Sequence, residues 1–313
     1  MLKKSALKKI MISTLSLILV SILYLFPNSY KQNSIDEKVT LKEPIKTTIY
    51  IPNNDGYVSR TEVISKSNDD EDLVKEIISY LTIDSEKNNY ISNFFNPIIP
   101  KGTKIIDLEI NNKLLKINFS QEFYNLEPGK ERKAIEAIVY SLTEISQIDQ
   151  VMIFVEGKIL NKIPNTNESL PPTLDRSMGI NITYDLNDFK NTQLITTYYI
   201  GKQNNNFYYI PISKLSNNDT EKVEVIIEEL KSAPIYQTNL MSFLKSNVKL
   251  LDYEILEDQI TLSFNNQLFD DISKQNILEE VKYSISLSIK DNYNIKTVIY
   301  NVDDTEILKF TLN

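Results

Sequence analysis

Acidic side chains are the groups in this chain whose type and spacing come closest to a chemical site. The stretch from Asn68 to Asp72 carries four acids in a row, and clustered carboxylates are typical calcium ligands. It lacks the alternating acids, the later glycine and the final glutamate of an EF-hand loop. An apolar helical pattern begins at Leu73, so the stretch fits a helix N-cap better. We therefore predict no metal site and no cofactor.

A pair of carboxylates acting as acid and base would be a second kind of chemistry. Glu109 and Glu122 could serve like the two acids of a glycosidase that cleaves peptidoglycan. With 42 acids in 313 residues, such pairs occur without any site around them. We predict no catalytic residue and no enzyme. A module that binds wall glycan is a third class, and the 18 tyrosines leave it open.

The residue types that the chain lacks exclude more kinds of chemistry than its acidic residues suggest. The chain has no Cys, His or Trp. Without His there is no Ser-His-Asp triad and no His metal ligand. Without Cys there is no disulfide, no thiol nucleophile and no lipid-carrying cysteine. The net charge of -8 argues against nucleic acid as a partner, because no basic field would attract phosphates.

The N-terminus predicts a membrane anchor. Four lysines within residues 1–9 precede an uncharged run from Ile10 to Phe26, near the lower length limit for a transmembrane helix, and Pro27 ends the run. The positive-inside rule leaves residues 1–9 in the cytoplasm and the bulk of the chain outside. A cleaved signal peptide is the alternative, but the run exceeds the usual apolar region of about 7 to 15 residues. We predict an uncleaved single-pass anchor at 10–26 and a stalk at 27–45.

Beyond the stalk, one order of elements is expected twice: strand, strand, helix, strand, strand, helix, strand. Alternating and β-branched runs predict the strands, and apolar residues at helical spacing predict the helices. In the first copy we expect strands at 47–51, 57–64, 105–110, 114–119 and 151–155, and helices over 73–81 and 134–142.

The second copy begins near Thr192. Thr196 to Ile200 corresponds to Thr47 to Ile51, and Leu250-Leu251-Asp252 corresponds to Ile105-Ile106-Asp107. Val298 and Tyr300 correspond to Met152 and Phe154. We interpret the chain as a tandem duplication, with a first domain at 46–160, a linker at 161–190 and a second domain at 191–313. The predicted class is α+β, each domain having two helices packed on a mostly antiparallel sheet.

Two segments are candidate interaction sites. The loop from Tyr90 to Pro100 carries four large apolar residues, which either plug the core or form an exposed patch for a neighbour. The Pro-rich linker contains its most distinctive stretch from Asp175 to Asn181. The candidate residues are Phe94, Phe95, Ile98, Ile99, Asp175 and Arg176.

The first copy resembles the GerM domain family of sporulation and spore germination proteins. The shared features are the Pro100-Lys101-Gly102-Thr103 turn, the strand and acidic-aromatic pair from Ile117 to Phe123, the helix end from Ser141 to Ile145, and the terminal strand from Val151 to Gly157. The second copy is divergent, with Ser246-Asn247 at the Gly-Thr position. The stretch from Asp175 to Asn181 also resembles the segment that joins the two domains in such proteins.

This resemblance, over residues 46 to 313, implies a non-enzymatic scaffold or assembly protein of sporulation. Its fold would be similar to a ring-building motif, and its partners would be protein components of the forespore channel complex, between mother cell and forespore, with peptidoglycan a further candidate. Family members are typically anchored through a lipidated cysteine, which this chain lacks, so the membrane attachment falls to Ile10–Phe26. The bulk would then lie in the intermembrane space during sporulation. The alternative is a cell-wall glycan-binding or accessory germination or cortex protein.

Overall fold

The computed structural model describes residues 4–25, 45–67, 69–186, 190–204, 206–217, 219–232, 239–271 and 273–312. The chain divides into two units, Met1–Glu43 and Pro44–Asn313. The first unit contains helix α1, Lys4–Leu25. Among the residues described, no helix combines the length and apolarity needed to cross a membrane. Phe26 and residues 27–44 of the expected stalk lie outside the described residues.

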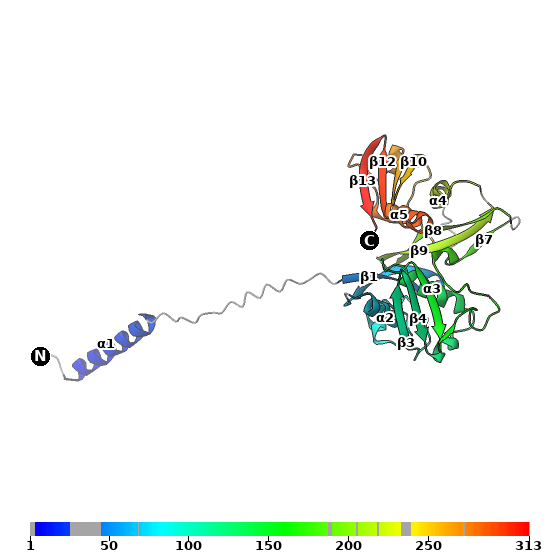
Figure 1. Cartoon of the computed structure of the whole chain (residues 1–313). Coiled ribbons are helices and arrows are strands. Elements are labelled where there is room, and N and C mark those ends of the chain that lie inside the picture. Colours follow the sequence, from blue (N-terminus) through cyan, green and yellow to red (C-terminus); the bar gives the residue numbers. More distant parts are fainter. Residues whose placement is uncertain are drawn as a thin grey trace. The chain divides into compact units, whose positions relative to one another are not determined.

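The second unit contains both predicted copies in the predicted order (Figure 1). Each copy gains a last strand that was not predicted, of two residues in the first copy and seven in the second. The first copy comprises β1 Ile45–Pro52, β2 Val58–Ser65, α2 Asp70–Leu81, β3 Ile105–Asn111, β4 Leu114–Phe119, α3 Glu131–Leu142, β5 Gln150–Val155 and β6 Lys158–Ile159. The second comprises β8 Thr192–Gln203, β9 Asn206–Asn217, α4 Lys222–Lys231, β10 Leu250–Leu256, β11 Gln259–Phe264, α5 Glu279–Tyr293, β12 Thr297–Val302 and β13 Thr305–Thr311.

Each copy has one four-stranded sheet. The strand orders are β3-β4-β5-β6 and β10-β11-β12-β13. The pairs β4–β5 and β11–β12 are parallel, because a helix connects the two strands in each case, and the remaining pairs are antiparallel. The predicted α+β class and the mostly antiparallel sheets are therefore confirmed.

A third sheet joins the two copies, which the sequence patterns did not predict. The opening hairpins meet in the order β1-β2-β9, with β8 on β9 and the short β7 (Thr183–Asp185) at one end. Between β2 and β9 the ladder has a single pair among the described residues, Arg60 with Tyr209. The predicted linker is paired with strands of both copies. Leu174 pairs with Val151, and β7 pairs with β9. The predicted boundaries at 160 and 190 stay predictions.

The helices α3 and α5 pack against this shared sheet. α3 contacts β1 and β5, and α5 contacts β8. Every residue of α3 from Ala134 to Leu142 is buried, which is expected for a helix covered on both sides.

The first strands of the two copies align one residue away from the predicted match. The amide of Tyr50 donates to Ser141 Oγ at 2.7 Å, and the amide of Tyr198 donates to Ser288 Oγ at 2.8 Å. Tyr198, and not Tyr199, is therefore the counterpart of Tyr50. A shift of one residue matters because it moves a side chain to the opposite face of the sheet.

The same correction applies to the last core strand. Val151 pairs with Leu115, and Val298 pairs with Ile260. Both valines are buried, whereas Met152 is only half-buried. Val298 is thus the counterpart of Val151 and not of Met152.

Candidate functional site

The acidic stretch ahead of α2 caps that helix. Asp69 accepts hydrogen bonds from the amides of Glu71 and Asp72 at 3.0 and 3.2 Å, which satisfies two of the free amides at the helix start. The predicted N-cap is confirmed, while Asn68 lies outside the described residues. Within the described ranges, no cluster of three or more acidic residues is placed to hold a metal ion.

The carboxylate pair considered for acid–base chemistry is engaged elsewhere. Glu109 forms an exposed ion pair with Lys116 at 3.0 Å. Glu122 accepts a hydrogen bond from Ser120 Oγ, and this bond lowers the pKa of the Glu122 carboxyl below its ordinary value. A general acid near neutral pH needs a raised pKa. Glu122 therefore lacks the raised pKa of a general acid.

The four apolar loop residues belong to the core, which is the first of the two alternatives that the sequence left open. Phe94, Phe95 and Ile98 are at most 9% exposed, and Ile99 is fully buried. The two phenylalanines pack on Tyr208 of β9, with ring centroids 5.2 and 5.7 Å away. Phe94 and Phe95 therefore contact the second copy of the same chain.

Arg176, from the predicted linker, lies between the two copies. Its guanidinium donates to Glu144 Oε1 at 2.7 Å, from the first copy, and to Asp291 Oδ1 at 2.5 Å, from α5 of the second. Its side chain is 17% exposed, and the two carboxylates are nearly buried. The ring of Tyr140 lies 4.9 Å below the guanidinium. This residue was singled out from the sequence, but its partners were not.

Two tyrosines complete a nearly two-fold arrangement around Arg176. The hydroxyl oxygens of Tyr50 and Tyr198 are 2.8 Å apart. Tyr50 donates to Glu144 at 2.9 Å, and Tyr198 donates to Asp291 at 2.6 Å. Because each hydroxyl has one proton, the two phenols do not donate to each other while both carboxylates accept. We name Tyr50, Glu144, Arg176, Tyr198 and Asp291 the junction cluster.

The electrostatics of the junction cluster are those of a structural joint. Burial alone would raise the pKa of Glu144, but Arg176 and Lys290 outweigh burial and hold that pKa well below its ordinary value. Burial raises the pKa of both Tyr50 and Tyr198. The carboxylate therefore stays ionised and the phenols stay neutral near pH 7. The arrangement holds one copy against the other.

The end of the same linker completes the sheet between the copies. Asn181 Oδ1 accepts from the Val58 amide at 2.9 Å, and Asn181 Nδ2 donates to the carbonyls of Val58 and Pro211 at 2.8 Å each. Pro211 has no amide proton, so it cannot donate in the β2–β9 ladder. The amide side chain takes the place of that missing bond. A proline between the apolar residues Ile210 and Ile212 was the available signal for this joint.

The predicted site residue Asp175 acts locally. Its Oδ1 accepts from the Ser177 amide at 2.9 Å, and its Oδ2 accepts from Gln150 Nε2 at 3.3 Å. Asp175 thereby starts the short 3-10 turn Arg176–Met178 and so positions Arg176.

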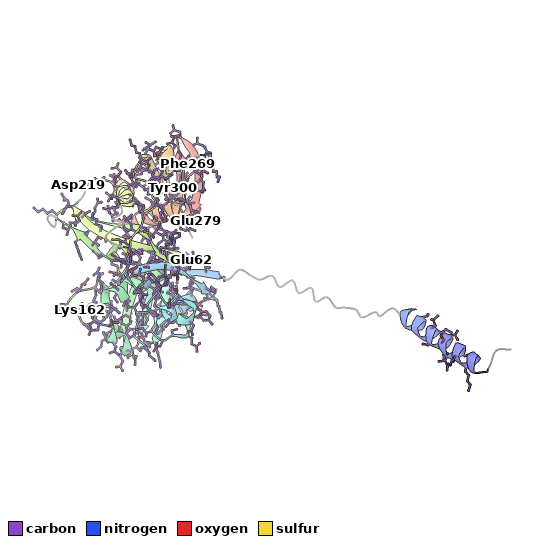
Figure 2. The ribbon with its side chains drawn as sticks, turned by 180° about the vertical axis from the view of Figure 1, so that it is seen from behind. Glu62, Lys162, Asp219, Phe269, Glu279 and Tyr300 are labelled. Carbon is purple, nitrogen blue, oxygen red and sulfur yellow. The ribbon has the colours of Figure 1, made fainter. Side chains whose placement is uncertain are left out.

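A groove of about 760 Å³ follows the line where β2 and β9 diverge. Its walls come from both copies, and Figure 2 labels Glu62 and Glu279, which both line it. Tyr90 and Phe207 contribute the exposed rings of the rim, at 69% and 40% exposure. Concave surfaces with aromatic walls and a few polar groups are typical binding sites. This junction groove is the main candidate surface of the chain.

Known proteins are similar to this chain in sequence and in fold. Residues 48–161 match the family described as Germane, sporulation and spore germination. Spore germination protein GerM of Bacillus subtilis (strain 168) is 28% identical over 262 residues, covering 82% of this chain and 70% of that protein. The solved tandem GerMN domains of the sporulation protein GerM from Bacillus subtilis match with a TM-score of 0.74 and 26% identity, over 83% of this chain and 91% of that one.

Proposed function

We propose that this chain, which is similar to the GerM family of sporulation and spore germination proteins, is a non-enzymatic scaffold or assembly protein. It acts outside the cytoplasm of a sporulating cell, at the channel complex between mother cell and forespore. It holds protein components of that complex and converts no substrate.

The joint between the two copies is the observation that carries this proposal. One sheet runs through both copies, and the buried junction cluster ties Glu144 of the first to Asp291 of the second. A scaffold must hold two surfaces at a fixed spacing, and a joint with a continuous sheet and a desolvated ion pair resists the domain motion that is otherwise the default.

The attachment to the membrane is part of the proposal. The lysine-rich residues 1–9 and the uncharged run Ile10–Phe26 support it. Cell fractionation tests it, with the full chain expected in the membrane pellet and a chain lacking residues 10–26 expected in the supernatant. Recovery of the full chain in the supernatant would overturn the attachment alone.

Capture of partners from sporulating cells tests the scaffold role. The tagged full-length protein is cross-linked in cells and purified, beside the variant R176M/N181A, which breaks the joint, and Lys162→Gln, an exposed control far from it. We expect channel components with the parent and with K162Q, and several-fold fewer with R176M/N181A. Equal capture by all three, or an intact forespore channel after gene deletion, would sink the scaffold role.

The exposed rings of Tyr90 and Phe207 favour one second candidate, binding of wall glycan. Co-sedimentation with purified peptidoglycan tests it, with a Tyr90→Ala/Phe207→Ala variant as comparison. Release of muropeptides by the parent protein would instead support an enzyme.

A further inference from the structure

Each copy has an edge strand that lies next to a groove. β3 and β10 lie at the ends of their sheets, and among the described residues each pairs with one strand alone, β4 or β11. A free strand edge presents backbone amides and carbonyls with which another chain can pair. β3 and β10 occupy the same place in the order of elements, so the two copies can be compared position by position.

Both edge strands break their ladder at the same point. The pairing skips Ile106 in β3 and Leu251 in β10. The two skipped side chains are large and aliphatic, and they are 52% and 60% exposed. Bulges and charged residues commonly protect an edge from pairing with other chains, but an exposed aliphatic side chain works against that protection. Folding does not require an exposed aliphatic residue, so its recurrence in both copies indicates an edge that a partner covers.

The groove beside each edge strand is formed with the first helix of the same copy. The groove between α2 and β3 measures about 670 Å³, and the groove between α4 and β10 measures about 540 Å³. Ile78 of α2 and Ile227 of α4 line the two grooves at corresponding positions. A strand added to either edge would therefore pack alternate side chains against the helix, as in other cases of strand addition.

The open face of each edge strand is acidic. Asp107 and Glu109 in β3 correspond to Asp252 and Glu254 in β10. Each of the four lies opposite a residue of the neighbouring strand that is not buried, so all four point to the open face of their sheet. Glu109 pairs with Lys116 at 3.0 Å. The other three form no ion pair within the described ranges.

The charges that stay unpaired around both grooves are mostly negative. Lys75 pairs with Asp72 in the first copy, while Lys231 pairs with Glu228 and Lys214 with Glu229 in the second. The charged residues that remain are Glu71, Lys104 and Asp107 in the first copy, and Glu224, Lys249, Asp252 and Glu254 in the second. Acids outnumber lysines at both edges. Two such edges paired with each other would place acids opposite acids, which destabilises a sheet.

We propose that β3 and β10 are two equivalent docking edges, each of which takes an extended basic segment of a partner protein as an added strand. Lysine or arginine side chains at alternate positions of that segment pair with the acids of the open face. The aliphatic side chains between them enter the groove beside the helix, and the added strand covers Ile106 or Leu251. The edges stand on the geometry, whereas a protein as their natural occupant rests on the proposed scaffold function.

Calorimetric titration of the full-length protein with a synthetic peptide tests the edges directly. The probe is the blocked peptide Val-Lys-Val-Lys-Val-Lys-Val, which has seven residues like β3 and β10. The control peptide has the same composition in the order Val-Val-Lys-Lys-Lys-Val-Val, so it keeps the charge and loses the alternation. We expect the alternating peptide to bind at one site in each copy, roughly tenfold more tightly than the control. Equal binding of the two peptides would overturn the docking edges, because charge alone would explain it.

Hydrogen exchange locates the bound peptide. At saturation, the alternating peptide should slow the exchange of backbone amides in β3 and β10 several-fold. The opposite edges of the same two sheets, β6 and β13, serve as internal controls and should exchange as before. Slower exchange in β6 or β13, with β3 and β10 unchanged, would contradict the assignment.

Variants identify the side chains that bind. Asp107→Lys and Asp252→Lys each reverse an exposed charge, so each should weaken one of the two sites about fivefold. Glu306→Lys reverses an exposed charge on β13, at the opposite edge of the second sheet, and should change nothing. Ile106→Ser and Leu251→Ser keep the charge and should weaken the same two sites. Unaltered binding in both D107K/D252K and I106S/L251S would overturn the edges.

Capture from sporulating cells tests the natural occupant separately. The parent should capture channel components, and D107K/D252K should capture several-fold fewer. Equal capture by both would overturn the partner segment as the occupant while the scaffold role stood. Capture by neither would overturn the scaffold role, and the peptide titration would still decide the edges. Sedimentation that shows a dimer of the parent, lost in Leu251→Ser, would assign the edges to another molecule of this chain and overturn the foreign partner.

Discussion

Arg176 supplies the positive charge that allows Glu144 and Asp291 to lie nearly buried between the copies. Burying charges costs free energy that their mutual attraction only partly offsets, so such a cluster adds specificity more than stability. Removing one member has a larger effect than the whole cluster is worth, because the remaining charges keep no partner.

Replacing Arg176 with methionine should therefore lower the free energy of unfolding by about 3 to 5 kcal/mol. Urea denaturation measures the loss. Lys101→Met, which breaks the exposed pair with Asp84, should change stability by no more than about 1 kcal/mol. The triple variant R176M/E144Q/D291N should recover part of the loss, because it leaves neither buried carboxylate without the guanidinium, although Lys290 loses its pair with Glu144. A loss in R176M as small as that in K101M would contradict the structural role.

The depressed pKa of Glu144 predicts a dependence of stability on pH. The folded state holds the Glu144 proton less tightly than the unfolded chain, whose ordinary value is 4.5. Its contribution is complete above that value and is lost as the pH falls below it. Denaturation curves between about pH 3 and pH 7 should show a shallower acid decline in Glu144→Gln than in the parent. An unchanged acid slope would mean that Glu144 is not ionised in the fold.

Glu136 gives a control of opposite sign. Burial raises its pKa, although Asn181 and Arg132 oppose the shift. Its contribution is present below the ordinary value and is lost as the pH rises through the raised pKa. In the parent, the free energy of unfolding should therefore fall as the pH rises above the ordinary value of Glu136, and Glu136→Gln should remove this fall. Glu144→Gln should instead reduce the loss of stability on the acid side.

At the scale of elements, local patterns predicted most of the structure. Helix α2 follows its acidic cap at Asp69, and in β4 and β11 buried residues alternate with half-buried or exposed ones as their sequences do. Both signals arise within a few neighbouring residues, so one sequence is enough to detect them.

The missed features depend on contacts between distant residues. The match of Thr196–Ile200 to Thr47–Ile51 was one residue out, because similar residues on both faces of these strands leave the register unspecified. The pairing of β2 with β9 joins Arg60 to Tyr209, and no local pattern reports such a partner. Burial of Phe94 and Phe95 likewise depended on Tyr208, which lies in the other copy.

Asn181 offers a test of the joint between elements. Asn181→Ala removes three hydrogen bonds that link Val58 and Pro211, so stability should fall by about 2 to 4 kcal/mol. Hydrogen exchange at the Val58 amide should also quicken. Asn165 has a similar left-handed backbone, with φ 59° against 48°, and is exposed. If Asn165→Ala costs as much, the loss comes from backbone strain and not from the joint.

At the scale of the whole molecule, duplication produced one body from two copies. Residues 44–313 form a single compact unit, and the linker between the copies supplies the residues that close the joint, Arg176 and Asn181. The junction groove is lined by residues of both copies. Separate copies would each lack part of its wall, so the groove and the joint are coupled in this fold.

This coupling predicts how the molecule unfolds. Proteins with two independent domains often unfold in two steps, whereas elements that share a sheet and a buried ion cluster lose them together. Scanning calorimetry of the parent should therefore show one transition whose calorimetric and van't Hoff enthalpies agree. R176M/N181A should show two transitions, because each copy keeps its own four-stranded sheet and helices. The matched pair K101M/N165A should keep one. Two transitions in the parent protein would mean that the shared sheet does not couple the copies, and a single lower transition in R176M/N181A would mean that the aromatic contact of Phe94 and Phe95 with Tyr208 suffices.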